Sequence, residues 1–254
     1  MKKIVKTSIT GLFIALFTLT SCSDEDPIGS SVTVYPIIDV QGDDIVFAPQ
    51  GESFTDPGAV ATVDDAEIPV ETTYTGMYQG QTYTETLETA VPDIYTASYT
   101  ATNADGFPRS ATRQIFVGRT GDLVNSIEGL YTSTVFRNGA QGAPASAYTD
   151  IKYIIIWKNA DGSYQISDAF GGWYLFARAI AGSETPGGKI VAEDIATNSF
   201  TFPGTQTNSY FGGSSEITGL KVNAADKSLN LTTVWQADAA TKYTFEVRLK
   251  QVQF

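Results

Sequence analysis

The chain has 254 residues and a formal net charge of −12, from 28 acidic and 16 basic side chains. It contains no histidine, which excludes Ser-His-Asp and Cys-His machinery and the usual zinc ligand sets. The acidic balance argues against nucleic acid as a partner. Fourteen Phe, thirteen Tyr and 23 Gly favour strands joined by turns, so we expect an all-β fold.

The first 21 residues differ from the rest of the chain. Residues 1–6 carry three lysines, residues 11–17 are apolar, and small residues precede Cys22. This succession is typical of a secretory signal peptide over residues 1–21. The apolar stretch is too short to span a bilayer stably, although an uncleaved membrane anchor is the alternative. Removal of this segment would bring the formal net charge to −15.

Cys22 is the only cysteine, so no intramolecular disulfide can form. The sequence Leu-Thr-Ser-Cys at 19–22 resembles the lipobox of bacterial lipoproteins, which implies that Cys22 is acylated and becomes the first residue. The acidic run at 23–26 resembles the surface-export signal of Bacteroidota lipoproteins, and a solvated linker is the alternative. We therefore expect a lipidated tether over residues 22–31, on the outer membrane and facing the cell exterior.

Residues 32–118 contain seven short predicted strands, a spacing that suggests a β-sandwich. The Phe-Thr-Asp-Pro-Gly-Ala segment at 54–59 and the stretch 95–106 resemble the conserved segments of bacterial immunoglobulin-like (Ig-like) domains. Asp93 and Phe107-Pro108 depart from that pattern, which affects the expected loop shapes. The resemblance implies an N-terminal Ig-like β-sandwich, a fold that commonly serves as a spacer or stalk.

A hinge at residues 119–122 leads into a second predicted domain over residues 122–254. Residues 243–252 show the clearest strand alternation, with apolar and polar side chains on opposite faces. We also expect a strand over residues 172–180. Without a strong helix signal, an antiparallel β-barrel and a β-sandwich both remain open. The other predicted strands are residues 130–136, 152–157, 163–167, 189–195, 199–202, 217–222 and 228–235.

The whole arrangement resembles lipoproteins of Bacteroidota polysaccharide-utilisation systems. In those proteins an Ig-like domain carries a C-terminal β domain away from the outer membrane. The second half of the chain holds no diagnostic motif, so the resemblance there concerns architecture. It implies a polysaccharide or oligosaccharide ligand and outer-membrane transport proteins as partners.

Aromatic residues provide the clearest sign of a ligand site. A sugar ring stacks its C–H groups on an aromatic face, while its hydroxyl groups need polar partners at the edge. Strand alternation would send Trp173 and Tyr174 to opposite faces, so that one of them could be exposed. Core packing is the alternative, and we interpret Trp157 and Trp235 as core residues. The candidate ligand-binding residues are Asp168, Phe170, Trp173, Tyr174, Tyr210 and Phe211.

Acidic residues suggest two further chemistries, both interpreted as solvated surface acids. Asp168, Glu193 and Asp194 are the only candidates for a glycosidase-like carboxylate pair, and no spacing rule links them. Residues 22–108 contain sixteen acidic residues and no Lys or Arg, so acidic loops could in principle bind calcium. The sequence shows no EF-hand spacing, however. The acids that could cluster in loops are Asp39, Asp43, Asp44, Asp64 and Asp65.

Three functions follow from these patterns. The first is a non-catalytic surface lipoprotein that binds or helps to take up a glycan, without a cofactor or metal. The alternative is a structural or protein-partner lipoprotein of an outer-membrane assembly. The third is a hydrolase that uses two carboxylates. We favour the first function and therefore predict that the protein is not an enzyme.

Overall fold

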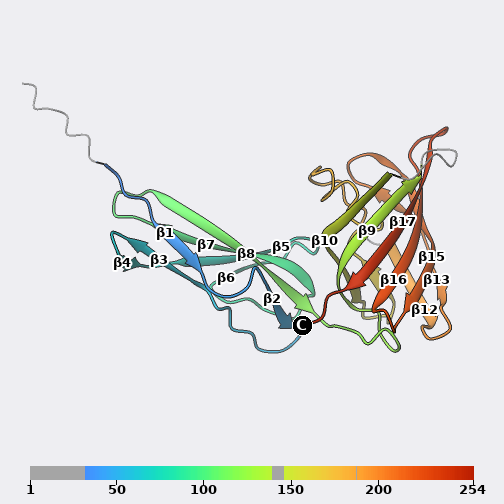
Figure 1. Ribbon diagram of the computed structural model, residues 1–254, viewed down its shortest axis with the longest axis horizontal. Coiled ribbons are helices and arrows are strands. Elements are labelled where there is room, and N and C mark those ends of the chain that lie inside the picture. Colours follow the sequence, from blue (N-terminus) through green and yellow to red (C-terminus); the bar gives the residue numbers. More distant parts are fainter. Residues whose placement is uncertain (1–31, 139–145, 187) are drawn as a thin grey trace, which may run out of the picture. The chain divides into compact units, whose positions relative to one another are not determined.

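The computed structural model describes residues 32–138, 146–186 and 188–254. Every regular element in these ranges is a β-strand, which confirms the predicted all-β fold (Figure 1). Within the same ranges we find no helix long and apolar enough to cross a membrane. The predicted signal peptide, the acylated Cys22 and the tether lie outside the described residues.

The Ig-like part consists of two sheets. A three-stranded sheet has the order β1-β3-β4, and a five-stranded sheet has the order β2-β8-β7-β5-β6 (Figure 1). All pairings are antiparallel except β2 with β8, which run parallel. The strands are β1 (Ile37–Val40), β2 (Ile45–Pro49), β3 (Ala59–Val63), β4 (Ala66–Ile68), β5 (Glu71–Gly76), β6 (Thr82–Thr84), β7 (Asp93–Thr102) and β8 (Pro108–Gly118).

Strand β7 supplies the centre of this core. Its alternate residues Tyr95, Ala97 and Tyr99 are fully buried, as the period-2 pattern of a strand requires. They pack with Tyr74 and Ile115 from the neighbouring strands β5 and β8. Aromatic side chains thus fill a domain whose surface is strongly acidic.

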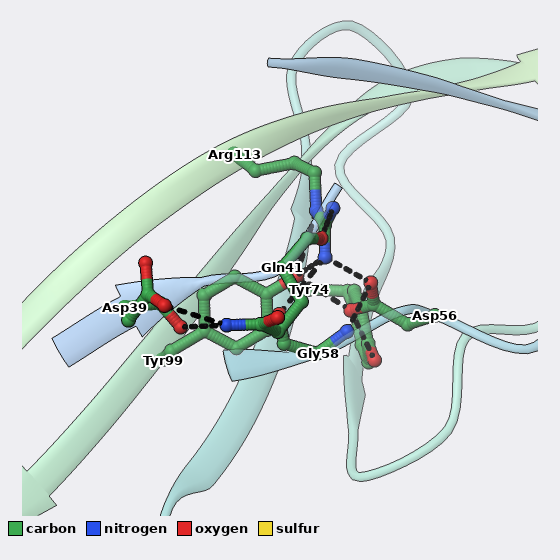
Figure 2. Close-up of polar contacts among 7 residues, drawn as sticks. All are labelled: Asp39, Gln41, Asp56, Gly58, Tyr74, Tyr99 and Arg113. Carbon is green, nitrogen blue, oxygen red and sulfur yellow. Dashed lines mark hydrogen bonds and ion pairs between the residues drawn. The ribbon is translucent and has the colours of Figure 1, made fainter. Parts of the chain in front are cut away.

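A buried ion pair crosses the inside of this sandwich (Figure 2). The Arg113 guanidinium lies 2.7 Å from the Asp56 carboxylate, and their side chains are only 1% and 8% exposed. The hydroxyl groups of Tyr74 and Tyr99 donate hydrogen bonds to the same carboxylate at 3.1 and 2.7 Å, and the backbone N–H of Gly58 donates at 3.1 Å. Since a buried charge is tolerated only when it is paired and hydrogen-bonded, this network accounts for the Phe-x-Asp-Pro-Gly motif.

Asp93, where the sequence departs from the Ig-like pattern, has a structural explanation. Its buried carboxylate accepts hydrogen bonds from the backbone N–H groups of Tyr78, Gln79 and Ile94. Burial raises the pKa of this carboxyl group, and the N–H donors partly oppose that rise. The departure therefore shapes the turn that follows β5.

The C-terminal part is a single nine-stranded antiparallel sheet that curls into a half-barrel. Its order is β13-β12-β11-β10-β9-β17-β16-β15-β14, and this half-barrel confirms the expected C-terminal antiparallel β domain. The strands are β9 (Gly129–Asn138), β10 (Ser146–Lys158), β11 (Tyr164–Ile166), β12 (Gly188–Asp194), β13 (Ser199–Thr201), β14 (Gln206–Asn208), β15 (Gly212–Asn223), β16 (Ser228–Gln236) and β17 (Lys242–Gln251).

The two edges of the curled sheet are joined by a side chain. Asn198, in the turn before β13, donates a hydrogen bond to the backbone carbonyl of Val222 on β15 and accepts one from its N–H. These two bonds imitate the pairing of a neighbouring strand. The Asn198 amide therefore satisfies backbone groups of β15 that β14 does not reach.

The predicted strand over residues 172–180 is wrong. Gly171 and Gly172 have positive φ angles of 63° and 83°, and residues 169–176 form consecutive turns. The backbone N–H groups of Phe176 and Ala177 both bond to the carbonyl of Gly172, which no extended strand could do. Trp173 and Tyr174 consequently do not alternate between two faces, and both are buried.

Residues 35–254 form one compact unit, and a third apolar cluster includes strands from both sheet systems. It joins Ile94 and Phe116 to Leu130, Ile155 and Trp157. Trp157 is thus a buried residue, which agrees with its interpretation as core.

The ion pair leads to a prediction. Replacing Arg113 with Met leaves the Asp56 carboxylate buried without a counter-charge, so we expect the Ig-like part to lose about 3–5 kcal/mol of stability. Hydrogen–deuterium exchange at the amides of β7 and β8 measures this loss as faster opening.

The matched control is Lys189→Met, which removes the exposed ion pair between Lys189 and Asp161. Water already solvates both of those charges, so protection in β11 and β12 should barely change. Equal losses of protection in the two variants would show that burial of the Asp56–Arg113 pair has no special importance.

Candidate functional site

The segment from Asp168 to Thr185 packs against the inner face of the curled sheet. The Phe170 ring stacks on Phe245 of β17 at 4.4 Å between centroids, and the Thr233 hydroxyl of β16 donates to the carbonyl of Ala169 at 2.7 Å. Phe170 is completely buried. This segment therefore fills the space that the sheet encloses.

Asp168 holds the segment in its folded shape. Its carboxylate accepts hydrogen bonds from the backbone N–H groups of Phe170, Gly172 and Thr185, at 2.8, 2.9 and 3.2 Å. Complete burial raises the pKa of Asp168 to about 6, although the three N–H donors favour the ionised form. In this conformation the carboxylate faces its own backbone.

Two glycines allow the close approach of this segment to the sheet. A Cβ atom at Gly171 would lie 2.4 Å from a methyl carbon of Val247 and 2.8 Å from one of Val135. A Cβ atom at Gly172 would lie 2.5 Å from a methyl carbon of Ile151. Since both backbones also have positive φ, only glycine fits here without strain.

Trp173 and Tyr174 lie at the end of the enclosed space and surround an arginine. The Arg137 guanidinium lies over the Trp173 ring at 5.1 Å and over the Tyr243 ring at 4.7 Å. It also donates a hydrogen bond to the Tyr174 hydroxyl at 3.0 Å. The Nε atoms of Arg137 and Trp173 are buried and have no partner among the described residues.

Tyr210 and Phe211 are the exposed members of the predicted set, at 61% and 39%. Both lie in the turn between β14 and β15, where the Asn208 side-chain oxygen accepts their backbone N–H groups at 3.0 and 2.7 Å. The Asn208 amide nitrogen donates to the carbonyl of Ser183 and thereby ties the turn to the enclosed segment.

These aromatic residues form a continuous layer, which we call the aromatic surface. Its accessible members are Tyr148, Tyr210, Phe211 and the partly buried Tyr243. Ring contacts run through the layer with centroid separations of 4.5–6.1 Å, and its supporting residues are Arg137, Trp173, Tyr174 and Trp235. Fixed, exposed rings backed by other rings can stack on a flat apolar ligand face.

The structure brings all six predicted residues, five aromatic residues and Asp168, into one region, but only Tyr210 and Phe211 are exposed. Tyr174 contacts Phe211 at 4.7 Å, whereas Asp168 and Phe170 lie beneath the surface. A direct ligand contact by any of the six stays a prediction. Tyr148 and Tyr243 were not predicted as surface members. Tyr148 lies before the strand predicted at residues 152–157, and Tyr243 falls on the apolar face of the strand predicted at residues 243–252.

The remaining acidic candidates do not form a cluster. Glu193 and Asp194 are exposed at the end of β12, and Asp194 accepts the backbone N–H of Thr197. Asp64 and Asp65 form the turn between β3 and β4. Among the described residues, no group of three acidic side chains lies close enough together to hold a metal ion.

A hollow lies in the Ig-like part. It has a volume of about 320 Å³ and borders the Asp56 network. Phe54 and Leu87 supply its apolar wall, and Glu85 is exposed at its edge. All four hydrogen bonds to the Asp56 carboxylate come from inside the protein, so that group is not free for a ligand.

The fold and these sites define a two-part, all-β protein with an Ig-like domain of bacterial surface type. The family model for the bacterial surface protein Ig-like domain matches residues 38–117, and a second family model, for a C-terminal domain, matches residues 120–251. The second match covers more than half of the chain, which therefore belongs to the family that this C-terminal domain defines.

One solved structure extends the comparison over both parts. The lipoprotein BT2262 from Bacteroides thetaiotaomicron matches with a TM-score of 0.61 and 24% sequence identity, over 85% of this chain and 100% of that one. At this identity the likeness shows a common fold. No curated protein matches the chain.

The buried carboxylate of Asp168 leads to a pH-dependent prediction. Its pKa is about 6 in the folded protein, above the 3.8 of an unperturbed Asp. The group therefore adds stability below pH 3.8, and this contribution disappears as the pH rises through 6. From that difference, we expect the stability of the wild type relative to Asp168→Asn to fall by about 3 kcal/mol over this interval.

Urea unfolding followed by tryptophan fluorescence measures the change, because Trp157, Trp173 and Trp235 all lie in the C-terminal part. The control is Asp238→Asn, whose exposed carboxylate has a lowered pKa because the loop N–H groups of Ala240 and Thr241 bind it. A difference between wild type and Asp168→Asn that stays constant with pH would contradict the prediction.

Proposed function

We propose that this protein is a lipid-anchored protein of the cell surface whose C-terminal domain binds a glycan, without catalysis, on the aromatic surface. The observation that carries the proposal is the turn at Tyr210 and Phe211. Its two large rings are exposed to solvent while Asn208 binds both of their backbone N–H groups. A ring that is already ordered loses little conformational entropy when a ligand stacks on it.

The chemistry of the surrounding residues suits a sugar. The C–H face of a pyranose packs on an aromatic ring, and its hydroxyl groups need donors and acceptors at the periphery. Tyr148, Tyr210 and Tyr243 each combine a ring with a hydroxyl group, so one side chain can serve both needs.

The proposed location rests on the start of the chain and on its relatives. The lipobox-like segment before Cys22 and the acidic run after it favour acylation and export. Support comes from the match to the bacterial surface protein Ig-like domain and from the likeness to BT2262, which is a lipoprotein. An Ig-like domain between tether and C-terminal domain would act as a spacer.

The alternative role is that of a structural or protein-partner lipoprotein of an outer-membrane assembly. Exposed aromatic residues are also common in protein interfaces, so the same surface would serve a protein partner. Co-purification of outer-membrane proteins, with no retention by any polysaccharide, would favour this role over glycan binding.

The lipid anchor gives a prediction for the protein purified from membranes. We expect mass spectrometry to find an N-terminal Cys22 that carries acyl chains, because cleavage and acylation are coupled at a lipobox. A Cys22→Ser variant should leave the membrane fraction, since the anchor depends on the thiol. An unmodified Cys22 thiol in the wild type, or cleavage at another residue, would contradict the proposed anchor.

The glycan site gives a prediction for Tyr210→Ala. Affinity electrophoresis against a polysaccharide panel should show retention of the wild type and about three- to tenfold weaker binding of the variant, the effect of one aromatic contact. Because Tyr210 is 61% exposed, its removal should leave the fold intact.

The control is Tyr35→Ala, which removes a tyrosine of similar exposure, 50%, from the Ig-like part. This variant should bind as the wild type does. Weakened binding in both variants would exclude the aromatic surface as the specific site, and absence of retention by every polysaccharide would contradict glycan binding itself.

A further inference from the structure

Two arginines accompany the aromatic surface, and neither is paired with a carboxylate. The ion pairs among the described residues are Arg113–Asp56 and Lys189–Asp161, so Arg137 and Arg178 have no acidic partner there. Both guanidinium groups lie near Tyr174, Arg137 through a hydrogen bond at 3.0 Å and Arg178 over the ring at 5.9 Å.

The position of Arg178 is set by its backbone. It lies in the folded segment after Gly172, next to Ala179, which has a positive φ of 52°. The N–H of Ile180 bonds to the carbonyl of Tyr174, so the chain closes a turn around Arg178. The side chain is exposed, and its cation–π contact with Tyr174 directs it toward the aromatic surface.

The electrostatic surroundings agree with an uncompensated positive site. Burial raises the pKa of the Tyr174 hydroxyl and Tyr243 adds to that rise, whereas Arg137 and Arg178 both lower it. Asp238 lies in the hairpin between β16 and β17, and its carboxylate binds the backbone N–H groups of Ala240 and Thr241 in its own loop.

We propose that the aromatic surface takes an anionic sugar, with Arg178 and Arg137 binding a carboxylate or sulfate group while the exposed rings stack on the sugar. This inference rests on the proposed glycan binding and specifies its ligand class. A guanidinium presents a planar fork of N–H donors that matches the oxygens of either anion. The aromatic rings hold Arg137 in one orientation, so little ordering is needed when the anion arrives.

The net negative charge of the whole chain makes binding of a polyanion a discriminating test of this proposal. A protein with a net charge of −12 repels polyanions in general, so retention of one requires a local positive site. The Ig-like part contributes to that repulsion, because no Lys or Arg occurs between Cys22 and Pro108. Binding of an acidic polysaccharide would therefore be informative, whereas on a basic protein it would not.

The experiment uses the full chain, purified from membranes in detergent, with matched pairs of polymers in affinity electrophoresis. Polygalacturonate is compared with its methyl ester, which keeps the sugar ring and removes the charge. Dextran sulfate is compared with dextran, so that a carboxylate ligand is distinguished from a sulfate ligand. We expect stronger retention by at least one charged member of these pairs, and weaker retention as the salt concentration rises.

The test variant is Arg178→Gln, and the control is Lys221→Gln. Lys221 is exposed near the C-terminal end of β15, whereas Tyr210 and Phe211 precede the start of that strand, so the control removes the same charge away from the aromatic surface. Arg178→Gln should weaken binding of the charged polymer about fivefold, the effect of one exposed ion pair, and should leave binding of the neutral polymer unchanged. Lys221→Gln should alter neither. Because Arg178 is exposed, the variant should fold normally.

Equal retention of the charged and neutral polymers would overturn this inference while leaving glycan binding intact. Equal weakening by Arg178→Gln and Lys221→Gln would also overturn it, because the effect would then come from net charge alone. If no polysaccharide is retained at all, the proposed function fails together with the ligand class.

Discussion

The C-terminal half of this protein depends on how one buried carboxylate is satisfied. Asp168 accepts three backbone N–H groups and thereby folds the segment that fills the curled sheet. An open nine-stranded sheet has one apolar face that must be covered, and this segment covers it with Phe170, Trp173 and Tyr174. The aromatic surface is the outer edge of that packing, since Phe211 lies against Tyr174 and Trp235. Support of the proposed site and stability of the core therefore come from the same contacts.

The Ig-like half uses buried carboxylates in a related way. Asp56 is neutralised by Arg113 and by two tyrosine hydroxyl groups, whereas Asp93 is held by backbone N–H groups alone. Each arrangement ties a loop to a strand. Arg113 is thus used inside the fold, while Arg137 and Arg178 at the aromatic surface lack acidic partners in the described structure. Arg113 thus differs from Arg137 and Arg178, whose described contacts are with aromatic side chains.

The sequence was most informative where a pattern depends on neighbouring residues. The alternation of residues 243–252 predicted β17, and the motif around Asp56 together with residues 95–106 predicted the Ig-like sandwich, which the family match confirms. The strand prediction failed over residues 172–180, a segment rich in aromatic and other apolar residues. There the positive φ angles of Gly171 and Gly172, together with the carboxylate of Asp168, impose turns. Those bonds join residues that no periodic pattern connects.

The sequence by itself determined the all-β class, the order of the two parts and the residue types of the candidate site, because strand alternation and turn chemistry are local properties. Only the tertiary structure decided which aromatic residues are exposed, since burial depends on strands far apart in the chain. It placed Trp173 inside and Tyr210 outside, and it brought Arg137 from β9 and Arg178 from the enclosed segment to the same tyrosine. The curl of the nine-stranded sheet into a half-barrel likewise follows from long-range strand pairing.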